Sequence, residues 1–246
     1  MKTVVLAAGK GTRLGDLTKN TPKPMLVVAG KPVLEHIISH IMQAGIKDYA
    51  LVVRYLREKI EDYFKDGSPL GIRVAYIPQP EAYGTGAALL AAKDFVAGDD
   101  VMMTFGDVVV SPEAYAGVLD VFKNTECDGA IGLNWVADPY KGAAVLTNEE
   151  GTVVTQIVEK PKQGELVSNW MNAGIFAFKP VVFKYLEKLK PSVRGEYEFP
   201  DAINAMINDG LTVRPYFIKG PWQDVGTPED LLRAEKILLG AEAGNE

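Results

Sequence analysis

Short apolar runs and amphipathic stretches alternate through the first half of the chain. Apolar runs of about five residues indicate buried strands, and apolar residues three or four positions apart indicate helices. This pattern predicts strands at residues 3–7, 49–53, 73–77 and 101–105, and helices at residues 32–44, 57–64, 86–95 and 112–124. Because strands and helices alternate, we expect a mostly parallel sheet with helices on both faces. Ligands of such sheets bind at the carboxyl ends of the strands.

The second half of the chain has shorter polar links between its apolar runs. The pattern predicts strands at residues 130–135, 143–146, 153–158, 174–178 and 213–217, a short segment at 222–224 to which no helix or strand is assigned, and helices at 181–189, 199–209 and 228–239. Residues 240–246 are expected to form a frayed tail. We therefore expect a mixed sheet in this half, and a single domain over residues 1–246 with two lobes, about 1–125 and 126–246, around one cleft.

The composition narrows the class of protein. A chain of 246 residues can bury a sizeable core, and its net charge of -6 argues against a nucleic-acid or anionic-membrane partner. Cys127 is the single cysteine, so an intramolecular disulfide is excluded, which is typical of a reducing compartment. The apolar run at the N-terminus is too short for a signal sequence or a membrane span. We expect a soluble, cytoplasmic protein.

A glycine-rich loop follows the first predicted strand. Gly9 and Gly11 let the backbone bend and bring N–H groups close to an anion, and Arg13 offers a planar cation for phosphate oxygens. The spacing matches neither the P-loop nor the dinucleotide-binding fingerprint, so the alternative is an ordinary glycine turn. Pro22 and Pro24 then restrict the backbone around Lys23 and limit where its side chain can point. The alternative interpretation is that Lys23 is a solvated lysine in a proline turn.

Residues 9–14, 17–18 and 22–24 together resemble the signature of the sugar-phosphate nucleotidyltransferases, G-x-G-T-R-L-x-P-x-T followed by P-K-P. The chain departs from it at Asp16, where the family usually has proline. The resemblance implies an α/β, Rossmann-like three-layer sandwich with a smaller sugar-binding lobe. It implies an enzyme that joins a nucleoside triphosphate to a sugar 1-phosphate and releases pyrophosphate. Arg13 and Lys23 would hold the triphosphate and the α-phosphate under attack.

A glutamine after the third predicted strand is the candidate for reading the base. Gln79 offers a donor and an acceptor, although taken alone the segment favours a surface glutamine in a strand-to-helix loop. By resemblance, Gln79 and Gly84 bind a pyrimidine, which favours UTP or dTTP. The nucleotide-binding set implied in this way is Leu6, Ala8, Gly9, Gly11, Thr12, Gln79, Gly84 and Thr85.

Two aspartates are candidates for a Mg²⁺ site. Asp107 ends the fourth predicted strand, where a carboxylate could hold this hard cation or instead cap the next helix. Asp224 lies more than a hundred residues away, and the sequence alone does not pair the two. The resemblance does, because both positions bind the metal in the family. Thr227 and Pro228 are expected to be the N-cap and the first residue of the last helix.

The sugar phosphate has its own candidates, all carried by the resemblance. Gly142, Glu159, Lys160 and Asn172 match segments that line the sugar pocket, with glucose 1-phosphate favoured. Glu159 and Asn172 would bind hydroxyls, and Lys160 would neutralise the phosphate. Without the family context, Glu159 and Lys160 are an exposed charged pair.

Other interpretations remain beside this one. His36 and His40 lie four residues apart and could suit a metal, but a partly buried helical face is favoured. The chain has no G-x-S-x-G elbow for a serine hydrolase and lacks the features of a dinucleotide-dependent oxidoreductase. The open alternatives are a mannose-1-phosphate guanylyltransferase, a CTP-dependent transferase acting on a phosphorylated alcohol, and a non-catalytic regulatory subunit. Family members often self-associate, so a homo-oligomer is also an expectation.

Overall fold

Four parallel strands form the N-terminal part of the sheet. The computed structural model describes residues 1–165 and 168–240. In it, β1 (Lys2–Leu6) lies between β6 (Val101–Phe105) and β4 (Asp48–Val53), and β5 (Arg73–Pro78) follows at the edge. All three pairings are parallel. The carboxyl ends of these strands therefore lie at one edge of the sheet, as the alternating sequence pattern predicts.

The second half of the chain extends the same sheet with mixed pairings. β11 (Trp170–Phe178) runs antiparallel to β6 and so joins the two halves into one nine-stranded sheet within the described residues. β11 also pairs with β8 (Gly129–Trp135) and β9 (Ala143–Thr147). β9 continues to β10 (Val154–Glu159), and β8 pairs in parallel with β12 (Val213–Phe217).

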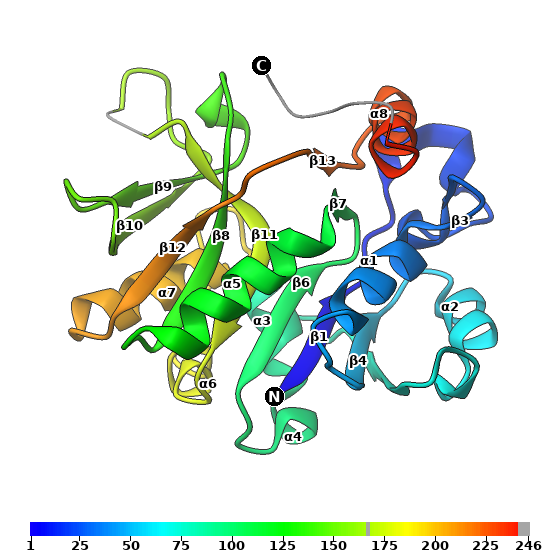
Figure 1. Ribbon diagram of the computed structural model, residues 1–246, viewed down its shortest axis with the longest axis horizontal. Helices are drawn as coiled ribbons and strands as arrows, with labels where there is room; N and C mark the ends of the chain where they lie inside the picture. The colour runs from blue at the N-terminus through cyan, green and yellow to red at the C-terminus, as the bar shows by residue number, and fades with distance from the viewer. Residues whose placement is uncertain (166–167, 241–246) are drawn as a thin grey trace.

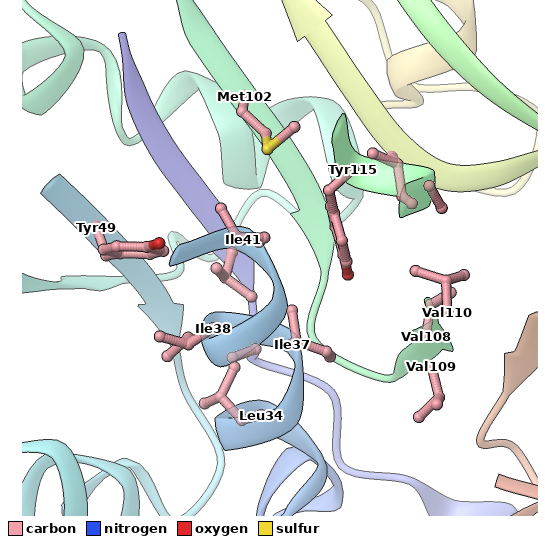
Figure 2. Close-up of a cluster of buried hydrophobic side chains, with 14 of the residues drawn as sticks. Leu34, Ile37, Ile38, Ile41, Tyr49, Met102, Val108, Val109, Val110 and Tyr115 are labelled. Carbon is pink, nitrogen blue, oxygen red and sulfur yellow. The ribbon is translucent and has the colours of Figure 1, made fainter. Parts of the chain in front are cut away.

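Helices cover both faces because successive strand residues point to opposite sides. Val5 and Leu51 pack in one apolar cluster with α1 (Val33–Met42), α2 (Arg57–Phe64) and α5 (Pro112–Asn124). Their neighbours Val4 and Val52 pack in a second cluster with α3 (Thr85–Leu90), α4 (Lys93–Val96), α6 (Val182–Leu186) and α7 (Phe199–Asn208). Figure 1 shows α1 and α5 crossing in front of the sheet, and Figure 2 shows side chains of the first cluster. The predicted three-layer α/β fold is confirmed.

Short elements complete the chain. α8 (Pro228–Leu238) packs against β2 (Val27–Val28) and β7 (Val108–Val110), and β2 pairs with β3 (Lys31–Pro32). Among the described residues, four 3₁₀ helices lie in the connections: η1 (Thr12–Thr18), η2 (Lys23–Met25), η3 (Ser68–Leu70) and η4 (Pro139–Lys141). In the part of the chain covered by residues 1–165 and 168–240, no helix combines the length and the apolar character needed to cross a bilayer.

Two predicted helices differ from the structure. The stretch expected at residues 86–95 is broken into α3 and α4 at Ala92, whose φ of -88° and ψ of 5° lie outside the helical range. No proline or glycine marks this break. α3 packs against the neighbouring helices α6 and α7, and tertiary packing overrides local helix propensity, which is only a weak guide to where a helix ends. The helix expected at 181–189 is shorter and ends at Leu186. The predicted tail at 240–246 lies almost wholly outside the described residues.

Candidate active site

A two-stranded ladder brings the two distant aspartates together. β7, which begins directly after Asp107, pairs antiparallel with β13 (Trp222–Asp224), so that Val108 lies opposite Asp224. The N–H of Val225 donates to the carbonyl oxygen of Asp107 at 2.9 Å. The indole N–H of Trp222 donates to the carbonyl of Ala173 at 2.9 Å and ties β13 to β11. Asp107 and Asp224 therefore share one site. The alternative that Asp107 caps the next helix does not hold, because Ser111 precedes the first residue of α5.

Lys23 lies between these carboxylates. Its Nζ donates to Asp107 and is 3.5 Å from Oδ1 of Asp224, and its side chain is only 9% exposed. Lys23 begins η2 between two prolines, which restrict its backbone as the sequence predicts. Gly11 has a φ of 69°, and a Cβ there would lie 3.0 Å from the Cβ of Lys23. The glycine loop can therefore approach the lysine closely.

Burial and neighbouring charges shift the pKa values of Lys23 and Asp224. Burial alone would lower the pKa of Lys23, but Asp107 and Asp224 outweigh burial and raise it. Burial raises the pKa of Asp224, and repulsion from Asp107 raises it further, while Lys23 and Arg13 lower it only in part. Burial and mutual repulsion therefore disfavour the ionised form of Asp224, and an additional cation bound beside it would favour that form.

The glycine loop holds Arg13 near the aspartates. Arg13 lies in η1 and is exposed, and a Cβ at Gly226 would come within 3.0 Å of its guanidinium. The hydroxyl of Thr18 closes the loop by donating to the carbonyl of Gly11 at 3.0 Å. At the position where the family has proline, Asp16 forms an exposed ion pair with Lys19 at 2.8 Å.

A first cavity of about 250 Å³ opens beside the glycine loop. It is lined by six of the residues expected to bind nucleotide, Leu6, Ala8, Gly9, Gln79, Gly84 and Thr85, and also by Tyr83, Phe105, Asp107 and Glu196. The other two expected residues lie elsewhere in the loop. Gly11 packs against Lys23, and Thr12 begins η1.

The wall of this cavity is fastened to the segment before α7. The N–H of Tyr197 donates to the carbonyl of Tyr83 at 2.8 Å, and the N–H of Gly86 donates to the carbonyl of Tyr197 at 2.8 Å. Gly84, with a φ of 128°, sits so close that a Cβ would lie 2.4 Å from the carbonyl oxygen of Tyr197. The N–H of Phe199 donates to the hydroxyl of Thr85 at 3.1 Å. Only glycine fits at position 84.

A second cavity of about 300 Å³ adjoins the first. Gly142, Glu159, Lys160 and Asn172, all expected to bind the sugar phosphate, line it together with Asp107 and Asp224. Thr85, Phe105, Asp107 and Glu196 belong to the walls of both cavities. Two ligands bound in these cavities would therefore meet beside the two aspartates.

The backbone shapes this second cavity. Lys160 has a φ of 46°, which is unusual for a residue other than glycine, and its N–H donates to the carbonyl of Gly142 at 2.9 Å. The side-chain oxygen of Asn172 accepts from the N–H of Gly174 at 3.0 Å. The four wall residues expected to bind the sugar phosphate thus come from β10 and β11 and the segments next to β9 and β10.

An arginine and two glutamates of this cavity were missed in the sequence. Arg194 donates to Glu198 at 2.6 Å, and its guanidinium lies 3.4 Å from Glu159 and 3.5 Å from Glu196. Burial raises the pKa of Glu159, repulsion from Glu198 adds to this, and Arg194 and Lys160 oppose it without cancelling it. The signal in the sequence was the charged run just before α7, but the partners of Arg194 were not evident there.

The metal ligands available are the two aspartates. Within residues 1–165 and 168–240, no three or more histidine, cysteine, aspartate or glutamate side chains gather in an arrangement that could hold a metal ion. His36 and His40 bind backbone carbonyls instead, in agreement with the predicted helical face. At the end of the site, Thr227 caps α8 and Pro228 is its first residue, as expected.

Known proteins resemble this chain over nearly its whole length. The family model described as Nucleotidyl transferase matches residues 2–240. The low-salt glycan biosynthesis nucleotidyltransferase Agl11 of Haloferax volcanii is 36% identical over 97% of this chain and 66% of its own length. The bifunctional protein GlmU of Methanococcus maripaludis is 40% identical over 97% of this chain and 54% of its own. The chain thus spans about two thirds of the first relative and about half of the second.

A relative of similar length and two solved structures complete the comparison. The UTP–glucose-1-phosphate uridylyltransferase AglF of Haloferax volcanii is 36% identical over 97% of this chain and 96% of its own. A putative glucose-1-phosphate thymidylyltransferase from Bacillus anthracis superposes with a TM-score of 0.86 at 30% identity, over 96% of this chain and 94% of that one. A UDP-glucose pyrophosphorylase complexed with UDP-glucose gives 0.87 over 98% and 99%, and at 24% identity it shows the fold alone.

Proposed function

The chain belongs to the nucleotidyl transferase family, and on that premise we propose that it joins a nucleoside triphosphate to a sugar 1-phosphate, releasing pyrophosphate and an NDP-sugar. UTP or dTTP with glucose 1-phosphate are the favoured substrates. The observation that carries the proposal is the meeting of two cavities at Asp107, where Lys23 and Asp224 converge. The names of AglF and of the Bacillus anthracis structure support the choice of substrates.

The reaction needs positioning and charge neutralisation rather than a nucleophile from the protein. A phosphate oxygen of the sugar 1-phosphate attacks the α-phosphorus of the nucleotide, and pyrophosphate leaves from the opposite side. Two unit negative charges about 4 Å apart repel by about 4 kcal/mol at an effective dielectric constant of about 20. Lys23, Arg13 and Lys160 are the cations that would offset this repulsion.

Asp107 and Asp224 fit a Mg²⁺ ion. Their carboxylates face one cavity, a cation bound beside them would favour the ionised form of Asp224, and oxygen ligands completed by substrate phosphates suit this cation. When bound, Mg²⁺ would neutralise charge on the reacting phosphates. We propose it as the cofactor, held by these two residues.

The two halves of the chain would divide the substrates between them. Most residues of the first cavity come from residues 1–125, and most of the second from 126–246, which supports a nucleotide-binding lobe and a sugar-phosphate-binding lobe. Gln79 is the candidate for reading the base, with Glu159 and Asn172 for the sugar hydroxyls. A buried lone cysteine supports a cytoplasmic setting. Self-association remains a prediction, to be measured by light scattering.

A grid of substrates tests this function. UTP, dTTP, GTP and CTP are each combined with glucose 1-phosphate or mannose 1-phosphate and Mg²⁺, and pyrophosphate release and product mass are measured. We expect turnover with UTP or dTTP and glucose 1-phosphate. A GTP and mannose 1-phosphate preference would select the guanylyltransferase alternative. Nucleotide binding without turnover for any pair would contradict the proposal and favour a regulatory subunit, although such a subunit would not need to keep Arg13, Lys23, Asp107 and Asp224 together.

A further inference from the structure

Helix α1 carries two histidines that the site described above does not use. Nε2 of His36 lies 2.8 Å from the carbonyl oxygen of Val28, and Nδ1 of His40 lies 2.8 Å from that of Val110. Because a carbonyl oxygen only accepts, each of these ring nitrogens must carry the hydrogen. Burial is the main influence on the pKa of His40 and lowers it, so a neutral ring with the hydrogen on Nδ1 fits its surroundings.

The two accepting carbonyls belong to the segments that carry Lys23 and Asp107. Val28 ends the short strand β2, which follows η2 and its first residue Lys23. Val110 ends β7, which begins directly after Asp107 and pairs with β13, the strand of Asp224. Val28 and Val110 are 3% and 1% exposed, so water can offer their carbonyls little replacement for the imidazoles.

Helix α1 packs against both segments. Its apolar residues, Ile37 among them, share one cluster with the three valines of β7, as Figure 2 shows. Residues four apart on a helix are separated by about 6 Å along its axis, and this spacing is fixed by backbone hydrogen bonds. The helix can therefore act as a rigid spacer between the two segments.

We propose that His36 and His40 are positioning residues, which use α1 to hold the Lys23 turn and the β7–β13 ladder at a set separation. This inference rests on the proposed function, since it concerns the geometry of that site. His40 fixes the ladder that brings Asp107 and Asp224 together, and His36 fixes the segment that follows Lys23. Neither histidine touches the reacting groups.

Isosteric substitutions separate this role from a general packing role. The amide nitrogen of asparagine stands as many bonds from Cβ as Nδ1 of histidine, and that of glutamine as many as Nε2. His40→Asn and His36→Gln therefore keep a donor in place, whereas His40→Gln and His36→Asn displace it. Phenylalanine keeps a ring and removes the donor. Each histidine thus has its own matched pair of variants.

The experiment measures kcat, both KM values and the Mg²⁺ concentration that gives half-maximal rate, together with the thermal midpoint. Hydrogen exchange of residues 108–110 and 222–225 is followed without substrate or metal. We expect His40→Phe and His40→Gln to lower kcat about tenfold, to raise the Mg²⁺ requirement about tenfold and to speed exchange in the ladder, with His40→Asn restoring all three. His36→Phe and His36→Asn should lower kcat without changing the Mg²⁺ requirement. His36→Gln should restore kcat.

Other outcomes overturn the proposal. Lower thermal midpoints with kcat and the Mg²⁺ requirement at wild-type values would mean that the histidines only stabilise the fold. Equal behaviour of His40→Asn and His40→Gln would exclude a placed donor, and this comparison stands even if the phenylalanine variants fail to fold. If the wild-type protein releases no pyrophosphate, the proposed function fails on its own, and unchanged exchange in the His40 variants then overturns the inference separately.

Discussion

Replacing Gly84 with alanine tests how the nucleotide cavity is built. Gly84 has a φ of 128°, and its new Cβ would lie 2.4 Å from the carbonyl oxygen and 2.6 Å from the nitrogen of Tyr197. The substitution therefore combines backbone strain with a collision against another backbone segment. Strain in this region, which is nearly restricted to glycine, costs roughly 1–3 kcal/mol.

The collision sets the expected effect on catalysis. Ordinary contacts begin at 3.4 Å, so a Cβ placed at 2.4 Å requires a movement of about 1 Å in one of the two segments. Thr85, the next residue, lines both cavities, and its hydroxyl accepts a hydrogen bond from the N–H of Phe199. The movement therefore reaches the walls of both cavities. A misplacement of about 1 Å can reduce the rate by about 100-fold, and we expect kcat/KM for the nucleotide to fall on this scale.

Gly98→Ala is the matched control. Gly98 has a φ of 83°, and no heavy atom of the described residues lies within 4 Å of a Cβ built there. It should lose about 1–2 kcal/mol of unfolding free energy from strain alone and keep its kinetics. Pyrophosphate release and urea unfolding are measured for both variants. If Gly84→Ala keeps kcat/KM within about twofold of Gly98→Ala, the argument for a tightly fastened binding loop is wrong.

Three further predictions concern charge and specificity. Lys23→Ala should lower turnover about 100-fold or more, as should Asp107→Asn, and near-normal pyrophosphate release by folded variants would refute their roles. Gln79→Ala should blur the preference among UTP, dTTP, GTP and CTP more than it lowers the maximal rate, and an unchanged preference would remove that assignment. The hydrogen-bonded guanidinium of Arg73 lowers the pKa of Asp48, so wild-type stability should fall as the pH drops below about 5, toward the folded pKa. Urea unfolding should show a shallower acid decline for Asp48→Asn, and equal slopes would contradict this.

Most of the fold was predictable because local pattern and tertiary packing agree. The helices at Arg57–Phe64 and Pro112–Asn124 match the predicted ranges, since each has an amphipathic repeat with clear ends. The strand at Val213–Phe217 matches for the same reason. Periodicity fails for β7 and β13, which have three residues each and too few positions to show a repeat.

The site was predictable in its parts and not in its assembly. The residues alone left Asp107 and Asp224 as separate motifs that only the family resemblance paired, because their meeting depends on the short β7–β13 ladder and no local pattern encodes it. Lys23 was expected to meet phosphate, and its ion pairs with both aspartates appear only in three dimensions. The contacts of Arg194 depend in the same way on a loop folding back to Glu159. The assigned roles stay predictions until substrates are tested.

A crystal structure with Mn²⁺ in place of Mg²⁺ and with the NDP-sugar product is the most direct test of the central claim. The account predicts an anomalous peak in contact with the carboxylates of both Asp107 and Asp224, with the diphosphate beside it. The base should lie near Gln79 in the first cavity and the sugar near Glu159 in the second. A metal bound away from the two aspartates, or a product outside the joined cavities, would contradict the account.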